Sequence, residues 1–525
     1  MSLNPLLLSI IAHARSGSLD HAWRLFQEGQ FDRVDDDPAV LSVHGRLLKD
    51  SALRASGVER RRYYLEAAKA YARAGEISGQ TYPLINAATL SLLAGKRQQS
   101  ETIARQVLER RDGGEQETPY WRAATKAEAM LLLGDARKAK AALSAAIARA
   151  PKAYEDHAST LRQFGLILEE QHQDDDWLDS CRPPRCLHFA GAMSVDGAVI
   201  ARRIRKLIDE ENIGFGYGAL AAGADIMIAE ALLEAGAELH LVLPAPRAVF
   251  REASVARFGA GWAKKFDRIL KAADSVRSVG TGRDPLSPLA VQLAAEVAMG
   301  RAVMQADLLM TEAVQLLVLN RDGLSRRKTS SGWIAANWKK TNRPQHILTA
   351  PHAKASKRVQ LETSSGCVAA LLRLDLSAAD PDRLTNDILP WLARALAAGS
   401  VPLAPPRWTG EAVLVGFEEA TAAARSALAA IAVLEEPTDM RIACHYAIVQ
   451  RAKDPFGGGV YLSGQPIALL SQIARSAPAG AIHLTEDFAA ALHADSARNQ
   501  PRTEYVGELP GETPDDPVRL FSLKP

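Results

Sequence analysis

The chain of 525 residues is poor in cysteine, has no long hydrophobic run and carries almost no net charge. Four cysteines scattered over this length do not make a disulfide framework, so we expect a reducing, cytoplasmic environment. No run of about 18 apolar residues occurs, which argues against a membrane-spanning helix. Because 63 Lys and Arg residues balance 61 Asp and Glu residues, no overall field favours a nucleic-acid or membrane partner.

Recognisable catalytic and metal-binding arrangements are also scarce. No Ser-His-Asp or Cys-His arrangement occurs at a familiar spacing, and we interpret His445 and His483, in or beside apolar strands, as structural. Cys181, Cys186 and His188 are zinc-ligand types that lie close together, but no second ligand pair follows at finger spacing. These absences argue against covalent nucleophilic catalysis and against a structural zinc site.

Residues 5–172 show helical periodicity almost throughout, with short turns that contain glycine or polar residues. The clearest pair of segments is Ile85–Gly95 and Lys126–Gly134, both rich in Ala and Leu and both ending at a glycine. A charged helical segment follows each of them, at residues 98–110 and 136–150. The two glycines lie 39 residues apart (134 minus 95), close to the repeat length of helical-pair solenoids. We therefore predict an all-α helical-repeat domain over residues 1–178.

This helical region resembles the tetratricopeptide-like TRAFs-binding domain. The likeness spans about residues 20–172 and is carried by Tyr82-Pro-Leu-Ile-Asn-Ala-Ala-Thr-Leu90, by Tyr120-Trp121 and by Leu133-Gly134-Asp135. The resemblance implies a scaffold that binds a protein partner or another part of the chain and has no chemistry of its own. From the residues alone, we interpret Tyr120 and Trp121 as core side chains between helices.

A second region, residues 183–350, alternates between short apolar strands and helical segments. An acidic run and Arg182-Pro-Pro-Arg185 mark the boundary before it, near residue 180. The predicted strands are residues 186–190, 213–217, 239–243, 275–279, 315–319 and 345–348. Helices are predicted at residues 198–209, 224–235 and 332–338. This alternation predicts an α/β domain with a Rossmann-like parallel sheet.

Glycines cluster where the second strand of this sheet leads into a helix, and we predict a ligand site there. Glycine removes the Cβ atoms that keep a ligand from the backbone, and a helix start offers N–H groups to a phosphate. The spacing differs from the dinucleotide G-x-G-x-x-G, which argues against a nicotinamide dehydrogenase. Alternatively, the glycines serve tight packing and Asp225 caps the helix. The candidate ligand-binding residues are Gly191, Gly214, Gly216, Tyr217, Gly218, Gly223 and Asp225.

The stretch Gly218–Pro244, with Gly223-Ala-Asp225 inside it and Val242-Leu-Pro244 at its end, resembles the SLOG superfamily of Rossmann-like proteins. The likeness covers about residues 185–350. Hydrolase members of that superfamily carry a P-G-G-x-G-T motif, where this chain reads Asn320-Arg-Asp-Gly-Leu-Ser325. The departure argues against phosphoribohydrolase activity. The resemblance then implies a domain that senses a nucleotide or nucleotide-derived ligand.

The third region, residues 360–525, again alternates strands and helices. Strands are predicted at residues 367–375 and 440–449, a turn running into a strand at residues 407–417, and helices at residues 382–398 and 420–434. Asp375 ends the first strand, and Glu411 lies at the turn that leads into the second. Paired carboxylates at neighbouring strand ends can hold divalent ions against a triphosphate. Both residues are therefore candidate catalytic residues and candidate Mg²⁺ ligands.

This region resembles class III nucleotide cyclases, which have an α/β fold of the ferredoxin-like type. Asp375 matches the family's first metal aspartate, Gly410-Glu411-Ala412 matches its G-D-A turn, and Arg407 stands where a base-selecting lysine is usual. Ala468 and Gln472 replace an asparagine and an arginine that act on the transition state. Because neither can supply the arginine's charge, the resemblance implies a fold without its cyclase chemistry. Cyclases of this class share sites between two chains, so a homodimer through this domain is also implied.

The combined prediction is a signalling or regulatory protein that binds a nucleotide-derived ligand through its Rossmann-like domain and a protein partner through its helical repeats. We expect no enzyme activity and no obligatory cofactor, with Mg²⁺ and a nucleotide as the candidate bound groups. One alternative is a nucleotide cyclase or another Mg²⁺-dependent nucleotide-processing lyase that uses Asp375 and Glu411. The other alternative is a protein–protein scaffold without a ligand.

Overall fold

The computed structural model describes residues 4–15, 18–110, 118–193, 195, 197–279, 286–320, 330–350, 366–376, 379–432, 440–455, 458–495, 502–511 and 517–524. The chain forms two compact units. The first unit comprises Met1–Pro183 with Leu308–Met310, and the second comprises Pro184–Asp307 with Thr311–Pro525. None of the described helices is both long enough and apolar enough to cross a membrane.

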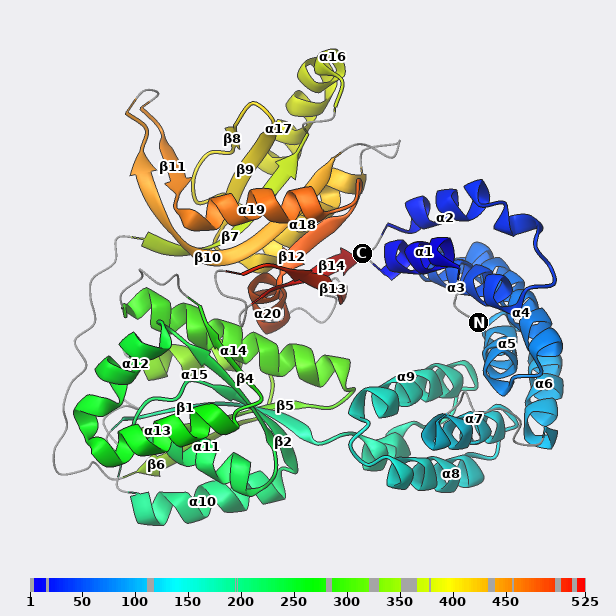
Figure 1. Cartoon of the computed structure of the whole chain (residues 1–525), viewed down its shortest axis with the longest axis horizontal. Helices are drawn as coiled ribbons and strands as arrows, with labels where there is room; N and C mark the ends of the chain where they lie inside the picture. Colours follow the sequence, from blue (N-terminus) through cyan, green and yellow to red (C-terminus); the bar gives the residue numbers. More distant parts are fainter. Residues whose placement is uncertain are drawn as a thin grey trace. The chain divides into compact units, whose positions relative to one another are not determined.

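The first unit consists of helices that pack against their neighbours in the chain, drawn in blue and cyan in Figure 1. They are α1 (Pro5–Arg15), α2 (Leu19–Glu28), α3 (Pro38–Arg54), α4 (Gly57–Ser78), α5 (Thr81–Leu93), α6 (Arg97–Glu109), α7 (Pro119–Leu132), α8 (Ala136–Arg149) and α9 (Tyr154–Glu170), with the 3-10 turns η1 (Phe31–Arg33) and η2 (Asp176–Cys181). Gly95 and Gly134 follow α5 and α7 with φ angles of 76° and 82°, the left-handed conformation that glycine favours at a helix end. The predicted helices and their glycine stops are confirmed.

Tyr120 on α7 lies in the core of the first unit, with 2% of its surface exposed. Its hydroxyl donates to Oγ1 of Thr160 on α9 at 2.9 Å. The predicted core role is confirmed for Tyr120, whereas Trp121 is half-buried. A second contact inside this unit joins α5 to α7, because the hydroxyl of Thr89 donates to Oε1 of Glu128 at 2.6 Å. Helix pairs that are distant in sequence are thus tied by hydrogen bonds as well as by apolar packing.

The second unit begins with a parallel sheet. Its strands are β1 (Arg185–Gly191), β2 (Ile213–Gly218), β3 (Glu238–Leu243), β4 (Ser275–Ser278), β5 (Ala313–Asn320) and β6 (Gln345–Ala350). Its helices are α10 (Gly197–Glu210), α11 (Ala224–Glu234), α12 (Arg247–Ser254), α13 (Ala260–Ala272), α14 (Pro288–Leu308) and α15 (Ser330–Lys340), with the 3-10 turn η3 (Ala256–Phe258). Among the described residues the strand order is β4-β3-β2-β1-β5-β6, and each neighbouring pair is parallel. The predicted parallel sheet is confirmed, strand by strand.

A mixed sheet follows in the same unit. Its strands are β7 (Gly366–Asp375), β8 (Arg407–Trp408), β9 (Ala412–Phe417), β10 (Arg441–Lys453), β11 (Val460–Ser463), β12 (Ile482–Thr485), β13 (Arg502–Leu509) and β14 (Val518–Lys524). Its helices are α16 (Pro381–Arg383), the π-helical turn η5 (Leu384–Ile388), α17 (Leu389–Ala398), α18 (Ala420–Ala432), α19 (Gln465–Ser476) and α20 (Glu486–Ala494). The helix predicted over residues 382–398 therefore contains a π turn, and the turn and strand predicted over residues 407–417 contain two strands.

Successive side chains of β7 point to opposite faces of the mixed sheet and enter two different hydrophobic cores. Ala370 and Leu372 point to the side covered by α17, α18 and α20, and Ala369 and Leu371 point to the side covered by α19. Figure 1 shows α19 on the opposite face of this sheet from α18. The strand is buried on both faces, which explains why its sequence is a continuous apolar run rather than an alternating one.

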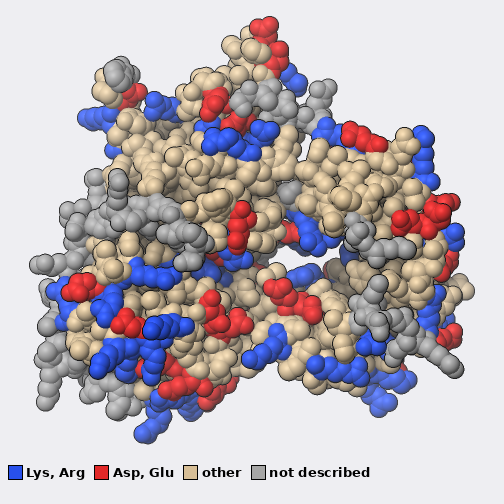
Figure 2. Space-filling model, in the orientation of Figure 1, with Lys and Arg blue, Asp and Glu red and all other residues tan. Residues whose placement is uncertain are grey.

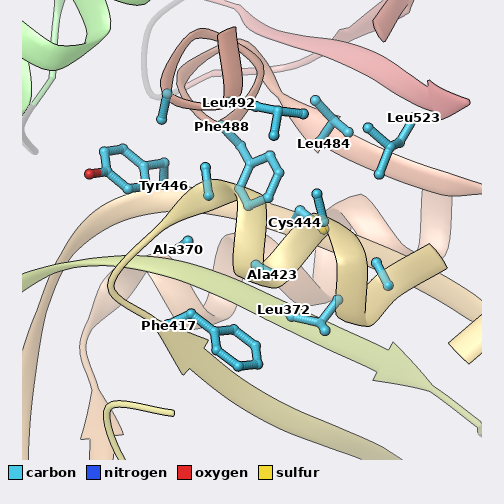
Figure 3. Packing of buried hydrophobic residues seen from close by; sticks show 14 of the residues in the cluster. Ala370, Leu372, Phe417, Ala423, Cys444, Tyr446, Leu484, Phe488, Leu492 and Leu523 are labelled. Carbon is cyan, nitrogen blue, oxygen red and sulfur yellow. The ribbon is translucent and has the colours of Figure 1, made fainter. Parts of the chain in front are cut away.

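The two sheets of the second unit share one hydrophobic cluster. Figure 3 shows its part under the mixed sheet, where Phe488 of α20 packs among residues of β10 and β12. Val242 of β3 and Val297 of α14 belong to the same cluster, so apolar packing continues from one sheet to the other. The domain boundary that we predict between residues 350 and 360 lies outside the described residues.

Candidate functional site

The strand order of the parallel sheet reverses at β1, because β2 and β5 lie on its two sides. In open parallel sheets, ligands bind outside the carboxyl ends of the strands at such a point. Gly191 ends β1 there, and the amide of Ala192 donates to the carbonyl of Val318 on β5 at 2.8 Å. The amide of Ala224, at the start of α11, donates to the carbonyl of Ala192 at 3.1 Å. The start of α11 is therefore held against this reversal point.

Asp225, the acidic residue of the predicted ligand-binding set, lies in the first turn of α11 and is 5% exposed. Its Oδ2 accepts a hydrogen bond from the amide of Ala221 at 3.1 Å. Burial raises the pKa of Asp225 to about 7, although the amides of Ala221 and Gly191 act in the opposite direction. Near neutral pH this carboxyl group can therefore carry a proton and donate a hydrogen bond, which an ordinary aspartate cannot do.

Gly191 and Gly223, the two predicted glycines nearest Asp225, are closely surrounded. A Cβ on Gly191 would overlap the Cβ of Ala224. Gly223 has a φ angle of 100°, and a Cβ there would lie 2.5 Å from the carbonyl oxygen of Met193. Both positions require glycine for the close approach of β1 to the start of α11, whether or not a ligand binds.

The glycines of β2 also face protein atoms. A Cβ on Gly214, Gly216 or Gly218 would come within 2.5 Å of a neighbouring residue, and these neighbours are, in order, Pro184, Leu232 and Phe189. Gly214 lies near the amino end of its strand, at the opposite edge of the sheet from Asp225. The geometry gives these glycines a packing role. Ligand binding by them stays a prediction.

Tyr217 and the amides of the turn after β2 are engaged inside the protein. Tyr217 is 3% exposed, and its ring stacks on the imidazole of His240 with centroids 4.7 Å apart. The amide of Ala222 donates to the carbonyl of Ser254 at 3.0 Å. Since the amides of Ala221 and Ala224 are also paired, a phosphate bound in this turn would have to replace existing hydrogen bonds.

Asp375 and Glu411 are brought together, as predicted, at the paired ends of β7 and β9. Asp375 lies opposite Ala412 in the antiparallel register, so Glu411 directly precedes its cross-strand partner. A third residue stands between the two carboxylates. Nη2 of Arg373 donates to Oδ2 of Asp375 at 2.9 Å and to Oε1 of Glu411 at 2.7 Å. The guanidinium thus occupies the position where a shared divalent ion would balance both negative charges.

The burial of these three side chains differs sharply. The side chains of Arg373 and Asp375 are 6% and 10% exposed, whereas that of Glu411 is 59% exposed. Arg373 was not among our predicted site residues, although its position is visible in the sequence. Residues two apart on a strand point to the same face, so an arginine two positions before a candidate metal ligand is a signal that can be read directly.

The other positions of the cyclase resemblance lie away from this pair. Arg407 of β8 is exposed, and its guanidinium carbon lies 5.0 Å from the centre of the Tyr461 ring. Ala468 and Gln472 are both exposed on α19, four residues apart. The hydrogen bonds that join Asp375 to Glu411 come from Arg373 and not from these three residues.

His445 and His483 belong to the mixed sheet and are buried. Nδ1 of His445 lies 2.9 Å from Oγ1 of Thr485. Burial lowers the pKa of His445 to about 3 and that of His483 to about 4. Both imidazoles are therefore neutral at physiological pH, in agreement with a structural role.

Charge is distributed without a dominant sign on the face shown in Figure 2, where Lys and Arg side chains are interspersed with Asp and Glu side chains. Among the described residues, the one group of metal-ligating side chains with converging ligand atoms is Asp174, Asp175 and Asp176, all exposed. Cys181, Cys186 and His188 do not form such a group within the described part of the chain.

Comparison with known families identifies a tetratricopeptide-like sequence in the first unit. Residues 6–91 match a family model described as Tetratricopeptide Repeats-Sensor. The matched residues run from α1 to α5. The comparison with curated proteins gives no match.

Solved structures similar to part of the chain are nucleotide cyclase domains. The adenylyl cyclase CyaB from P. aeruginosa is 14% identical, with 31% of this chain and 97% of that chain covered and a TM-score of 0.25. The guanylate cyclase domain of RhGC from Catenaria anguillulae is 13% identical, with 30% and 96% covered and a TM-score of 0.25. The guanylyl cyclase domain of the RhoGC fusion protein from Blastocladiella emersonii is 15% identical, with 30% and 95% covered and a TM-score of 0.25. These scores are too low to assign an activity to this chain.

Proposed function

We propose that this protein is a regulator in a signalling process, with a mixed sheet that does not cyclise nucleotides and a parallel sheet that binds a nucleotide-derived ligand. The observation that carries the proposal is the position of Arg373, whose guanidinium bridges Asp375 and Glu411. The match of residues 6–91 to a family described as a sensor supports a signalling role. The tetratricopeptide-like helices support binding of a protein partner, through which the regulator would act.

Both the charge and the position of Arg373 oppose metal-dependent chemistry at this pair of carboxylates. A Mg²⁺ ion takes six oxygen ligands at about 2.1 Å, and it needs the carboxylates that Arg373 already neutralises. Moving the guanidinium aside would leave a charged group without its partner at a position 5% exposed to water. The side chains of Ala468 and Gln472 also carry no positive charge that could stabilise a transferring phosphate.

The proposed ligand site is the carboxyl edge of the parallel sheet near Gly191 and Asp225. A protonated Asp225 could donate to a ring nitrogen or carbonyl of a base, and an ionised one could accept from a ribose hydroxyl. The reversal of strand order at β1 supports this location. The likeness of Gly218–Pro244 to the SLOG superfamily supports the nucleotide class of ligand.

The deciding experiment is incubation of the purified chain with ATP or GTP and either Mg²⁺ or Mn²⁺, followed by chromatography of the products. We expect no cyclic nucleotide from the wild-type chain. Titration with Mn²⁺ alone gives a second readout. The wild type should not bind Mn²⁺ at Asp375 and Glu411, whereas Arg373→Met, which removes the charge and keeps much of the volume, should gain Mn²⁺ binding.

A nucleotide cyclase is the second candidate function, and one observation favours it. Asp375 and Glu411 converge on a single nitrogen atom, so the two carboxylates that such an enzyme needs are already close together. A cyclic product that the wild type forms and Asp375→Ala does not form would establish this activity and reject the proposal above.

Thermal denaturation in the presence of nucleotides distinguishes a sensor from a scaffold that binds no ligand. A ligand at about one hundred times its dissociation constant adds about 2.7 kcal/mol to the free energy of unfolding. A set of mono-, di- and cyclic nucleotides that leaves the unfolding temperature unchanged would favour the scaffold. A shift that Asp225→Ala abolishes would favour the sensor and place its ligand at the parallel sheet.

A further inference from the structure

The second unit contains a cleft of about 640 Å³, away from both Asp225 and the Asp375–Glu411 pair. Residues of α14 and α15, from the parallel-sheet part, line it together with residues of β7, β10, α18 and α20 from the mixed-sheet part. Its volume falls in the range of small-molecule sites, about 300–1,000 Å³. Sites of this kind often lie where two layers of structure meet, as this cleft does.

A partly buried hydrogen bond joins the two walls of the cleft. The hydroxyl of Tyr446 on β10 donates to Oε2 of Glu296 on α14 at 2.8 Å. Nε2 of Gln292, one turn before Glu296, donates to its other oxygen at 3.3 Å. Burial raises the pKa of Glu296 to about 7, although the hydrogen bonds from Tyr446 and Gln292 act to lower it. The carboxyl group is therefore held in place by neighbours from both walls.

Further carboxylates gather around the same phenol. Burial, and then the negative charges of Glu296, Asp495 and Glu418, raise the pKa of Tyr446 well above its usual value. Glu418 and its neighbour Glu419 also line the cleft and are exposed to solvent. Several carboxyl groups are thus gathered along the lining of the cleft.

Among the described residues that line the cleft, the positively charged side chains are exposed. Lys340 at the end of α15 and Arg425 on α18 line the opening, and both are exposed. Lys340 is close enough to Glu296 to lower its pKa, whereas Asp495 raises it. Four carboxyl groups therefore line the cleft together with two cationic side chains. Glu296 and Asp495 are half-buried, whereas Glu418, Glu419 and both cations are exposed.

The start of α18 could in principle attract an anion, but an internal carboxylate already fills that position. Oδ2 of Asp495 accepts from the amide of Thr421 at 3.1 Å and from its hydroxyl at 2.8 Å. The positive end of the helix dipole is thereby neutralised from within the protein.

The cleft is also lined by an aromatic side chain. Trp333 on α15 is half-buried, so part of its indole surface is available for contact.

We propose that this cleft binds a small organic cation with ammonium or guanidinium groups, held by Glu296 and Glu418 and packed against Trp333. Carboxylates form strong charge-assisted hydrogen bonds with such groups, and an indole attracts a cation over its face. The site goes beyond the proposed nucleotide site and does not depend on it. Because the two walls come from α14 and from the mixed sheet, a bound cation joins both parts of the second unit.

The test is isothermal titration of the full-length protein with spermidine, a flexible tri-cation, and with 1,8-octanediol as a neutral molecule of similar length. We expect spermidine to bind with a stoichiometry near one and the diol not to bind. The whole chain carries a net charge of +2, so unspecific attraction of a polycation is small. Glu296→Gln keeps the volume and an acceptor for Tyr446, and it should weaken binding about tenfold or more.

A matched control and a second variant keep the test decisive. Glu252→Gln on α12 removes the same charge from an exposed position that does not line the cleft, and it should leave the affinity unchanged. Glu418→Gln at the solvent-exposed rim should fold normally and weaken binding less than Glu296→Gln does. Absence of spermidine binding at millimolar concentration, equal binding of the diol, or wild-type affinity in both cleft variants would overturn the proposal.

Discussion

Arg373 and Asp375 lie two residues apart on β7, and their side chains form a buried ion pair with Nη2 and Oδ2 2.9 Å apart. The pair lies where the sequence predicts a metal ligand. A cation that belongs to the chain therefore balances the carboxylate that a bound metal would otherwise balance. The same arrangement explains how an aspartate is stabilised at a position 7% exposed to water.

Removal of Asp375 should destabilise the second unit strongly. In Asp375→Ala, Arg373 loses its buried partner and keeps the exposed Glu411, and removing one member of a buried pair typically costs about 3–5 kcal/mol. Glu411→Ala is the matched control, because the Glu411 side chain is 59% exposed and its ion pair should contribute about 1 kcal/mol or less. Urea denaturation followed by circular dichroism measures both. Equal losses in the two variants would contradict this account.

Glu486 should make the protein sensitive to acid. It starts α20 and is 3% exposed; Arg277 donates to it at 2.9 Å and Arg519 at 3.0 Å. Burial alone would raise its pKa, but Arg301, Arg277 and Arg519 together lower it to about 2, against 4.5 for the ordinary group. A lowered carboxylate pKa stabilises the fold above pH 4.5, and this stabilisation is lost as pH falls from 4.5 towards 2.

The corresponding variant is Glu486→Gln. It should lose on the order of 3 kcal/mol at pH 7, and its stability should change less between pH 5 and pH 3 than that of the wild type. Unfolding free energies measured at several pH values test this. A wild-type pH profile in the variant would show that Glu486 is not the group responsible.

Asp225 should have the opposite effect on pH dependence. Burial raises its pKa to about 7 from the ordinary value of 3.8. The folded chain thus holds a proton that the unfolded chain releases, so its stability should fall as pH rises from about 4 to 7, by at most about 1.4 kcal/mol per pH unit. Asp225→Asn keeps an oxygen for the amide of Ala221 and should remove this decline. An equally steep decline in the variant would contradict the raised pKa.

The strands and helices were predictable because their signals are local. The strands β1, β3 and β5 of the parallel sheet are mainly apolar runs, and each confirmed helix has its own periodicity. The pairing of Arg277 with Glu486 was not predictable, since 209 residues separate them and many arginines and glutamates are available. Contacts between distant residues also decide the role of the glycines of β2, which the sequence alone indicated as a ligand site. Only the fold shows that Leu232 and Phe189 fill the space beside Gly216 and Gly218.

Gly223 should tolerate substitution far less than Gly236, although both have positive φ angles. Gly236→Ala should cost about 1–2 kcal/mol for its φ of 73°, since a Cβ there meets no atom within 4 Å. In Gly223→Ala the new Cβ also overlaps the carbonyl groups of Ala192 and Met193. Such overpacking typically costs a further ~1–3 kcal/mol. Thermal unfolding of the two variants measures the difference. Similar losses would mean that β1 can move away from α11 freely.

Gly300 lies where a helix of the parallel-sheet part meets a helix of the mixed-sheet part. It lies within α14, and a Cβ there would overlap the backbone carbonyl of Ala490 on α20. Because a backbone cannot rotate away as a side chain can, Gly300→Ala should push α14 from α20 and destabilise the unit by about 3 kcal/mol or more. Gly165 on α9 is the matched control, because a Cβ there meets nothing within 4 Å.

Gly165→Ala should therefore stabilise the first unit by about 0.5–1 kcal/mol, the ordinary gain from alanine in a helix. The contrast separates helix propensity from packing, since both glycines lie inside helices and only Gly300 faces another backbone. Differential scanning calorimetry measures the transitions. If α14 and α20 hold the two sheets together as one cooperative structure, Gly300→Ala should also broaden or split the transition of the second unit. A single sharp transition at the wild-type temperature would show that the sheets do not depend on this contact.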